Sequence, residues 1–373
     1  MPLSPRFYTP SAAEHAATAP GSMPDPMNLR SRIMPDDELE ALRRQGAKSR
    51  KLVKYYETQN ELIRTLLTPV HYVDEDVTAR LGMVRGAMYA SVVANIVLFM
   101  LQLWVAVSSG SLSLFATMAD AFMDLASNTV LLVAGHAATR ESPFKYPVGK
   151  TRLETAGIIV FASLMATLSF QLIIESGRTL LGQQHTVVIS FANLLCIGFA
   201  ILLKAALFVY CHYLRMFPST SILAIDHRND VILNLTAVFF SLLGQHVNPL
   251  VDPVGGIVIA MLIMHSWVGV AMEQIKLIVG RSADAAFLQR ITYITCVHDD
   301  RVLKVDTCRA YTMGSNFFVE VDIVLEPQMS LLEAHDVGEA LQMKLEELPM
   351  VDRAFVHLDY ESTHPPEHRK MGM

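Results

Sequence analysis

The chain has 373 residues, of which 52% are hydrophobic, and its mean hydropathy is positive. This composition excludes an ordinary soluble protein of that length. The chain is also longer than membrane helices alone require, so a membrane domain with attached soluble segments is expected. The net charge of -6 is mild and gives no indication of a nucleic-acid partner.

Residues 1–82 are expected to form a cytosolic N-terminal region. Residues 1–37 carry many prolines among small polar residues and are expected to be disordered. Residues 38–67 are expected to be helical, because acidic residues at the start are followed by basic ones, as the helix dipole favours. This segment is either a solvated cytosolic helix or an arm that binds a membrane surface or a partner.

Six apolar runs follow, each near or above the ~20 residues that a membrane-spanning helix needs. They predict helices at about 84–106, 111–138, 154–181, 187–213, 219–245 and 253–275. Lys and Arg gather around the first run, between the second and third, between the fourth and fifth, and after the sixth. By the positive-inside rule, these connections and both termini are cytosolic. Residues 83–280 are therefore predicted to be the six-helix transmembrane domain.

Two of these runs carry the same polar stripe, two Asp residues and one Asn at intervals of four. The residues are Asp120, Asp124 and Asn128 in the second run, and Asp226, Asp230 and Asn234 in the fifth. Residues four apart lie on one face of a helix, so each stripe points both of its carboxylates in the same direction. At 1.5 Å per residue, all four carboxylates lie roughly 10 to 20 Å into a core of ~30 Å. They can therefore converge on one site.

A cation is the interpretation that fits these acids best. An ionised carboxylate in a bilayer is costly unless a partner, water or a cation compensates it. A salt bridge to Arg228 or Lys204 is the competing interpretation, but the repetition of the pattern favours a divalent metal. Oxygen donors suit Mn²⁺, Mg²⁺ or Ca²⁺, whereas imidazole and thiolate favour Zn²⁺ and Cu. Because Mg²⁺ dehydrates reluctantly and Ca²⁺ prefers six to eight oxygens, Mn²⁺ is the best single candidate and Fe²⁺ the next.

Three further polar residues lie in or beside the apolar runs. Asn95 in the first run either packs at a helix interface or supplies a carbonyl oxygen to the site. Lys204 in the fourth run is expected to extend along its helix and place its ammonium group in water at the cytosolic end. His227 is expected to point away from the face of Asp226 and Asp230 and not to be a ligand.

Hydropathy falls after Ser282, and residues 281–362 read as a small α+β domain. The order α-β-β-α-β places helices on one face of a short sheet. A core of about 80 residues is modest, so pairing with a second copy would add stability. The expected elements are a helix at 283–297, strands at 302–312 and 316–325, a helix at 330–348 with a Ser330/Glu333 capping box, a strand at 351–359, and a tail at 363–373.

These features together resemble the cation diffusion facilitator family over about residues 80–362. The resemblance rests on the two Asp stripes, residues 146–154 (YPVGKTRLE), the six predicted helices and the α-β-β-α-β domain. It implies a ferredoxin-like cytosolic domain and a homodimer that exports divalent metal in exchange for protons, either from the cell or into an organelle such as the vacuole or Golgi. The transport site that it implies consists of Asp120, Asp124, Asp226 and Asp230, with Asn95 and Asn234 as weaker members.

The same resemblance bears on which metal is transported and on whether the cytosolic domain binds metal. Zinc-transporting members typically carry His in place of one of the four Asp residues, so this chain is similar to the manganese-type branch that includes plant and fungal metal tolerance proteins; Zn²⁺ and Fe²⁺ remain alternatives. Zinc-transporting relatives also bind metal at the end of the cytosolic sheet. Asp322, His335, His357 and Asp359 fall near those places and are either metal ligands or ordinary polar surface residues.

The main alternative is an enzyme. Intramembrane prenyltransferases hold Mg²⁺ and a diphosphate on Asp-rich motifs, but those motifs run closer to D-x-x-D-x-x-x-D, and no Lys/Arg cluster lies beside Asp120 and Asp124 to bind phosphate. An intramembrane aspartyl protease needs one Asp on each of two helices. The sequence therefore favours a transporter, with no resident cofactor, whose partners are a divalent metal ion, protons and the membrane.

Overall fold

The computed structural model describes residues 23–45, 49–69, 75–109, 112–138, 144–182, 191–246, 250–348 and 350–363. The described residues form two compact units. One unit is Glu75–Val279, and the other combines the residues before Glu75 with those from Gly280 onward.

The described part of the first unit consists of six long helices. They are α3 (Glu75–Ser109), α4 (Leu112–Ala138), α5 (Arg152–Leu180), α6 (Phe191–Tyr213), α7 (Pro218–His246) and α8 (Val251–Val279). These helices coincide with the six apolar runs, so the prediction of a helical membrane domain is confirmed. Among the described residues, Gly82–Trp104, Arg152–Leu180 and Pro253–Val279 are long and apolar enough to cross a membrane, and Ile197–Tyr213 is a shorter apolar helix.

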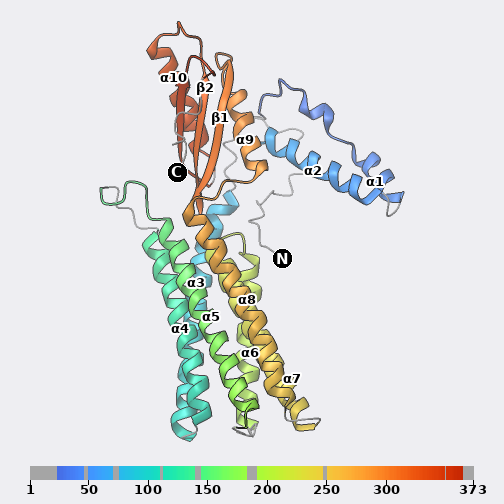
Figure 1. Ribbon diagram of the computed structural model, residues 1–373, viewed down its shortest axis with the longest axis vertical. Helices are drawn as coiled ribbons and strands as arrows, with labels where there is room; N and C mark the ends of the chain where they lie inside the picture. Colours follow the sequence, from blue (N-terminus) through green and yellow to red (C-terminus); the bar gives the residue numbers. More distant parts are fainter. Residues whose placement is uncertain are drawn as a thin grey trace. The chain divides into compact units, whose positions relative to one another are not determined.

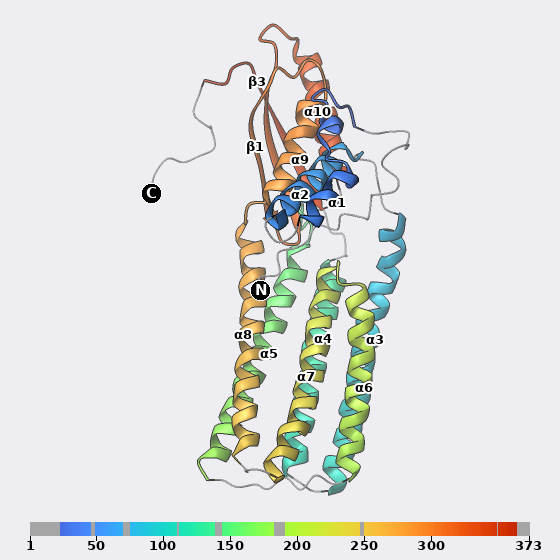
Figure 2. The same cartoon turned by 90° about the vertical axis from the view of Figure 1, so that its right-hand side faces the viewer.

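The helices α4 and α7, which carry the two polar stripes, lie in the middle of this bundle. Helix α5 packs along α8 at one side, α3 lies beside α6 at the other, and α4 and α7 run between these pairs (Figure 2). Small residues permit close approach of the helices. An added Cβ at Gly157 of α5 would collide with the methyl group of Ala134 in α4, and one at Gly256 of α8 would lie 2.8 Å from the hydroxyl of Ser176 in α5.

The second unit is a three-stranded mixed sheet with helices around it (Figure 1). Strand β1 is antiparallel to β2, and β2 is parallel to β3. The elements are η1 (Leu29–Arg32), α1 (Asp36–Arg44), α2 (Arg50–Leu67), α9 (Ala285–Cys296), β1 (Lys304–Met313), β2 (Asn316–Val324), α10 (Leu331–Glu346) and β3 (Val351–Asp359). The predicted α-β-β-α-β order from α9 to β3 is confirmed, and so is the capping box of Ser330 and Glu333 at the start of α10.

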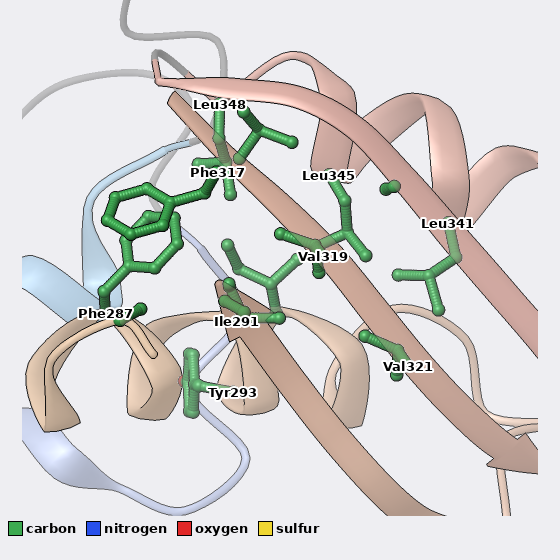
Figure 3. Close-up of a cluster of buried hydrophobic side chains, with 14 of the residues drawn as sticks. Phe287, Ile291, Tyr293, Phe317, Val319, Val321, Leu341, Leu345 and Leu348 are labelled. Atoms are coloured by element: carbon green, nitrogen blue, oxygen red, sulfur yellow. The ribbon is translucent and has the colours of Figure 1, made fainter. Parts of the chain in front are cut away.

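Helices α9 and α10 cover one face of this sheet. Val319 and Val321 of β2 are completely buried, as are Ile291 of α9 and Leu341 of α10 (Figure 3). The rings of Phe287 and Phe317 stack with their centroids 4.7 Å apart. Because side chains alternate along a strand, the residues between the buried ones on β2 point to the opposite face of the sheet.

The N-terminal residues pack onto this same core. Met23, together with Ile63 and Leu67 of α2, belongs to the buried cluster that contains Ile291. The Tyr293 hydroxyl of α9 donates to the carbonyl oxygen of Pro24 over 2.5 Å. The N-terminal segment is therefore held by residues more than two hundred positions away in the chain.

These contacts correct the predictions for the N-terminal region. The expected disorder is wrong for residues 23–37, because a proline-rich composition does not reveal that a distant core will bind the segment. The helix expected at 38–67 is two helices, α1 and α2. Residues 46–48, between these helices, lie outside the described residues, as do residues 1–22 and 364–373.

Candidate metal site in the helix bundle

Lys204 joins two of the predicted site residues inside the bundle. Its Nζ on α6 lies 2.5 Å from Oδ2 of Asp230 on α7 and 3.2 Å from Oδ2 of Asp124 on α4. The Lys204 side chain is 4% exposed, whereas Asp124 and Asp230 are 21% and 16% exposed. The prediction that Lys204 places its ammonium group in water is wrong, because the ammonium group contacts carboxylates on two neighbouring helices instead. Arg228, the other basic partner considered, donates to Oδ1 of Asn229 instead.

Asp226 lies one turn before Asp230 on α7 and is 1% exposed. Asn128 of α4 donates from Nδ2 to Oδ2 of Asp226 over 3.4 Å, and to the carbonyl oxygen of Asp124 over 2.9 Å. The Oδ1 of Asn128 is buried and has no hydrogen-bond partner among the described residues. The interface of α4 and α7 thus brings a buried carboxylate and a spare amide oxygen together.

His227 completes a cluster of three potential ligand side chains with Asp226 and Asp230, whose donor atoms lie within 4.8 Å of one another. Its Nδ1 is 3.9 Å from Oδ2 of Asp226, and its Nε2 is 2.9 Å from Oγ of Ser91 on α3. The prediction that His227 points away from these carboxylates is therefore wrong for one of its two nitrogens. Consecutive residues of a helix point in different directions. The imidazole ring of His227 is nevertheless long enough to place one of its nitrogens near Asp226.

The remaining residues of the predicted site are Asp120, Asn95 and Asn234. The backbone of Asp120 lies in α4 one turn before Asp124, and its side chain is outside the described part of the structure. Asn95 of α3 is 1% exposed, and neither polar atom of its amide has a hydrogen-bond partner within the described residues. Asn234 donates to the carbonyl oxygen of Asp230 in its own helix over 2.8 Å.

Taken together, three carboxylates and the amide oxygen of Asn128 form a polar region within an apolar bundle. Oxygen donors of this kind bind hard divalent cations. A cation held by the carboxylates of Asp124 and Asp230 would have to share their oxygens with Lys204. The structure thus contains the salt bridge to Lys204 that the sequence offered as the competing interpretation of these Asp residues. A lysine within a membrane helix is also by itself an indication of a functional site.

A second polar group lies on the face of the cytosolic sheet opposite α9 and α10. Asp322 and His357 pair across β2 and β3, and Nε2 of His357 lies 3.1 Å from Oδ1 of Asp359. His335 is not part of this group, because it lies on α10, where its Nδ1 is 3.5 Å from the carboxylate of Asp336. A pocket on this face is lined by Thr307, Arg309, Glu320, Asp322, Phe355, Val356 and His357.

The hydrogen bonds on this face join strand to strand. The Tyr311 hydroxyl donates to Glu320 over 2.6 Å, and the Thr307 hydroxyl donates to Asp322. Burial, together with the Glu320 carboxylate, raises the pKa of Tyr311 to about 12. Asp322 therefore already has a hydrogen-bond donor beside it.

Residues 88–279 match the cation efflux transmembrane domain, and residues 283–361 match the cation efflux protein cytoplasmic domain. The chain belongs to the cation diffusion facilitator family. Relatives of this cation diffusion facilitator include two proteins of Oryza sativa subsp. japonica. Metal tolerance protein 7 is 38% identical over 335 residues, which are 86% of each chain. Metal tolerance protein 5 is 43% identical over 288 residues, 76% of this chain and 69% of the relative.

Metal tolerance protein 11 of Arabidopsis thaliana is 37% identical to this cation diffusion facilitator over 342 residues, 85% of this chain and 83% of the relative. The protein is therefore a multi-pass integral membrane protein and a cation efflux transporter. Membership of this family excludes the prenyltransferase and the aspartyl protease as alternatives.

Proposed function

We propose that this transporter exports Mn²⁺ from the cytosol in exchange for protons, through a site formed by Asp120, Asp124, Asp226 and Asp230. One observation carries the proposal. Asp124 on α4 and Asp230 on α7 lie close enough to share one ammonium group, at 3.2 and 2.5 Å. Carboxylates that can share an ammonium group can also share a metal ion. Asn95 and Asn234 are weaker members of the proposed site.

The donor set supports Mn²⁺ ahead of other metals. Carboxylate and amide oxygens are hard ligands, which suit Mn²⁺ and give Zn²⁺ little of the nitrogen or sulfur coordination that it favours. The imidazole of His227 is engaged through Nε2 by Ser91 at 2.9 Å. Its Nδ1, 3.9 Å from Asp226, is the feature that keeps Zn²⁺ as an alternative, and Fe²⁺ is the other.

Proton coupling follows from competition for the same groups. A carboxylate that coordinates a metal ion cannot hold a proton on the same oxygen, so binding of the metal releases protons and protons release the metal. Alternation between packings of the helices that open to one side or the other would carry the site across the membrane. An acidic compartment then drives Mn²⁺ out of the cytosol.

The proposal extends to assembly and location. The protein is proposed to be a homodimer that associates partly through its cytosolic domain. Its proposed location is an endomembrane such as that of the vacuole or Golgi, with both termini in the cytosol. Light scattering of the detergent-solubilised protein tests the dimer, since it would give the mass of two chains.

Uptake into proteoliposomes with an imposed pH gradient tests the function. Vesicles with an acidic interior should accumulate Mn²⁺ faster than Fe²⁺, Zn²⁺, Co²⁺ or Ca²⁺, and an ionophore that collapses the gradient should stop the accumulation. Asp124→Ala and Asp230→Ala should each abolish uptake. Glu175→Ala is the matched control, because that carboxylate lies on α5 and is 65% exposed. Normal Mn²⁺ uptake by both Asp variants would overturn the site, and uptake that ignores the pH gradient would overturn the coupling.

A further inference from the structure

Lys204 is more deeply buried than the two carboxylates that its ammonium group contacts. Its side chain is 4% exposed, while those of Asp124 and Asp230 retain 21% and 16% exposure. A cation that arrives at these partly exposed carboxylates therefore meets oxygens that already interact with an ammonium group.

The charges in this region are unequal. Among the described side chains, the carboxylates of Asp124, Asp226 and Asp230 surround the single ammonium group of Lys204. Lys204 thus leaves a formal charge of two negative units on these three carboxylates, and the side chain of Asp120, the fourth proposed ligand, lies outside the described part of the structure. Without the lysine, the same carboxylates would attract a divalent cation more strongly, because charges interact more strongly in a protein interior than in water.

We propose that Lys204 is a tethered cation that competes with the transported metal for Asp124 and Asp230, and so keeps metal binding weak enough for release. This rests on the proposed function, since it takes these carboxylates as the ligands. When the metal binds to Oδ2 of either residue, the ammonium group withdraws from that oxygen. When the metal leaves, the ammonium group returns, so part of the negative charge of the metal-free site stays compensated.

This competition serves two requirements of a transporter. Binding must be strong enough for the ion to enter and weak enough for it to leave, and a built-in competitor lowers affinity without removing a ligand. Lys204 also holds α4 and α7 together, because its two partners lie on different helices. The carboxylates of the two helices therefore stay close to each other when they hold no metal.

Two substitutions separate the charge of Lys204 from its bulk. Lys204→Met removes the charge and keeps a long unbranched side chain, whereas Lys204→Arg keeps the charge. Equilibrium titration of the purified full-length protein in detergent with Mn²⁺ should show about tenfold or more tighter binding for Lys204→Met. Lys204→Arg keeps a positive charge beside the same carboxylates and should therefore stay within about threefold of the unmodified protein. In proteoliposomes, Lys204→Met should lower both KM and kcat, because the metal enters readily but is released slowly.

A purely structural role for Lys204 predicts different results. It would make Lys204→Met bind Mn²⁺ equally or more weakly, and that result would overturn the proposal. If Lys204→Met fails to fold, cells grown with added Mn²⁺ should recover the folded protein, since the metal replaces the missing positive charge; failure of this rescue also overturns the proposal. If the unmodified protein takes up no Mn²⁺, it is the proposed function that fails.

Discussion

Asn128 and Asn234 occupy equivalent places in the two polar stripes, yet their amide groups make different contacts. Asn128 donates to the carboxylate of Asp226 on another helix, at 3.4 Å, and its Oδ1 has no partner among the described residues. Asn234 donates to a carbonyl oxygen of its own helix, at 2.8 Å. The first amide therefore links α4 to α7, and the second stabilises only α7.

Replacing each Asn by Leu should separate these roles. Asn128→Leu should lower kcat/KM for Mn²⁺ about tenfold or more, because a buried carboxylate loses a donor and the site loses an amide oxygen. Asn234→Leu should lower kcat/KM by less than about threefold, because it removes only a hydrogen bond to a carbonyl oxygen within α7. Initial rates of uptake into proteoliposomes measure both variants. Equal losses, or a larger loss in Asn234→Leu, would contradict this assignment.

The sequence predicted where the carboxylates of the site lie, but not which partners the long side chains around them contact. The spacing of the Asp residues indicated that their carboxylates meet at one depth, and Asp124, Asp226 and Asp230 do lie in one region of the bundle; their role as ligands stays a prediction. A contact between Lys204 and the Asp residues was one of two interpretations of the sequence, but the choice between them and the partners of His227 could not be anticipated, because long side chains are placed by neighbouring helices. Helical periodicity gives the direction of a Cβ atom but not where an ammonium group or ring nitrogen ends.

At the scale of elements, the local sequence pattern predicted those helices and strands that are determined by their own residues. The α10 helix begins at the capping box that its sequence contains, and the apolar runs became helices. The N-terminal segment is the contrasting case, since contacts made by α2 hold it. Asn60 of α2 is 3% exposed, and its side chain bonds both to the backbone nitrogen of Met34 at 2.9 Å and to the carbonyl oxygen of Met34 at 2.8 Å.

Asn60→Leu should release this segment. The substitution leaves the amide and carbonyl groups of Met34 without partners in a partly buried place, at a cost of about 1–3 kcal/mol. Hydrogen exchange measured by mass spectrometry on the full-length protein should then show faster exchange around residues 29–36. Thr58→Ala, an exposed change on the same helix whose hydroxyl bonds only locally to Lys54, is the control. Unchanged exchange in Asn60→Leu would show that α2 does not hold the segment.

At the scale of the whole molecule, both ends of the chain contribute to one hydrophobic core. Hydropathy separates the membrane helices from the rest of the chain, and the α-β-β-α-β pattern describes the domain after Gly280. Neither pattern indicates that Met23, Ile63 and Leu67 are buried in that domain. Such contacts are not visible in a sequence, because an apolar residue on an amphipathic helix does not identify the surface that covers it.

Two deletions should distinguish this shared core from a separate N-terminal arm. Deletion of residues 1–69 removes the three buried side chains that belong to this core, Met23, Ile63 and Leu67, each worth about 1.5–3 kcal/mol of burial, and uncovers the side of α9 that carries Tyr293. Deletion of residues 1–22 stops before Met23 and keeps every one of these contacts. Hydrogen exchange in α9 and β1 should therefore rise sharply in the longer deletion and stay unchanged in the shorter one. Equal protection in both deletions would mean that the core of the domain after Gly280 is stable without the N-terminal helices.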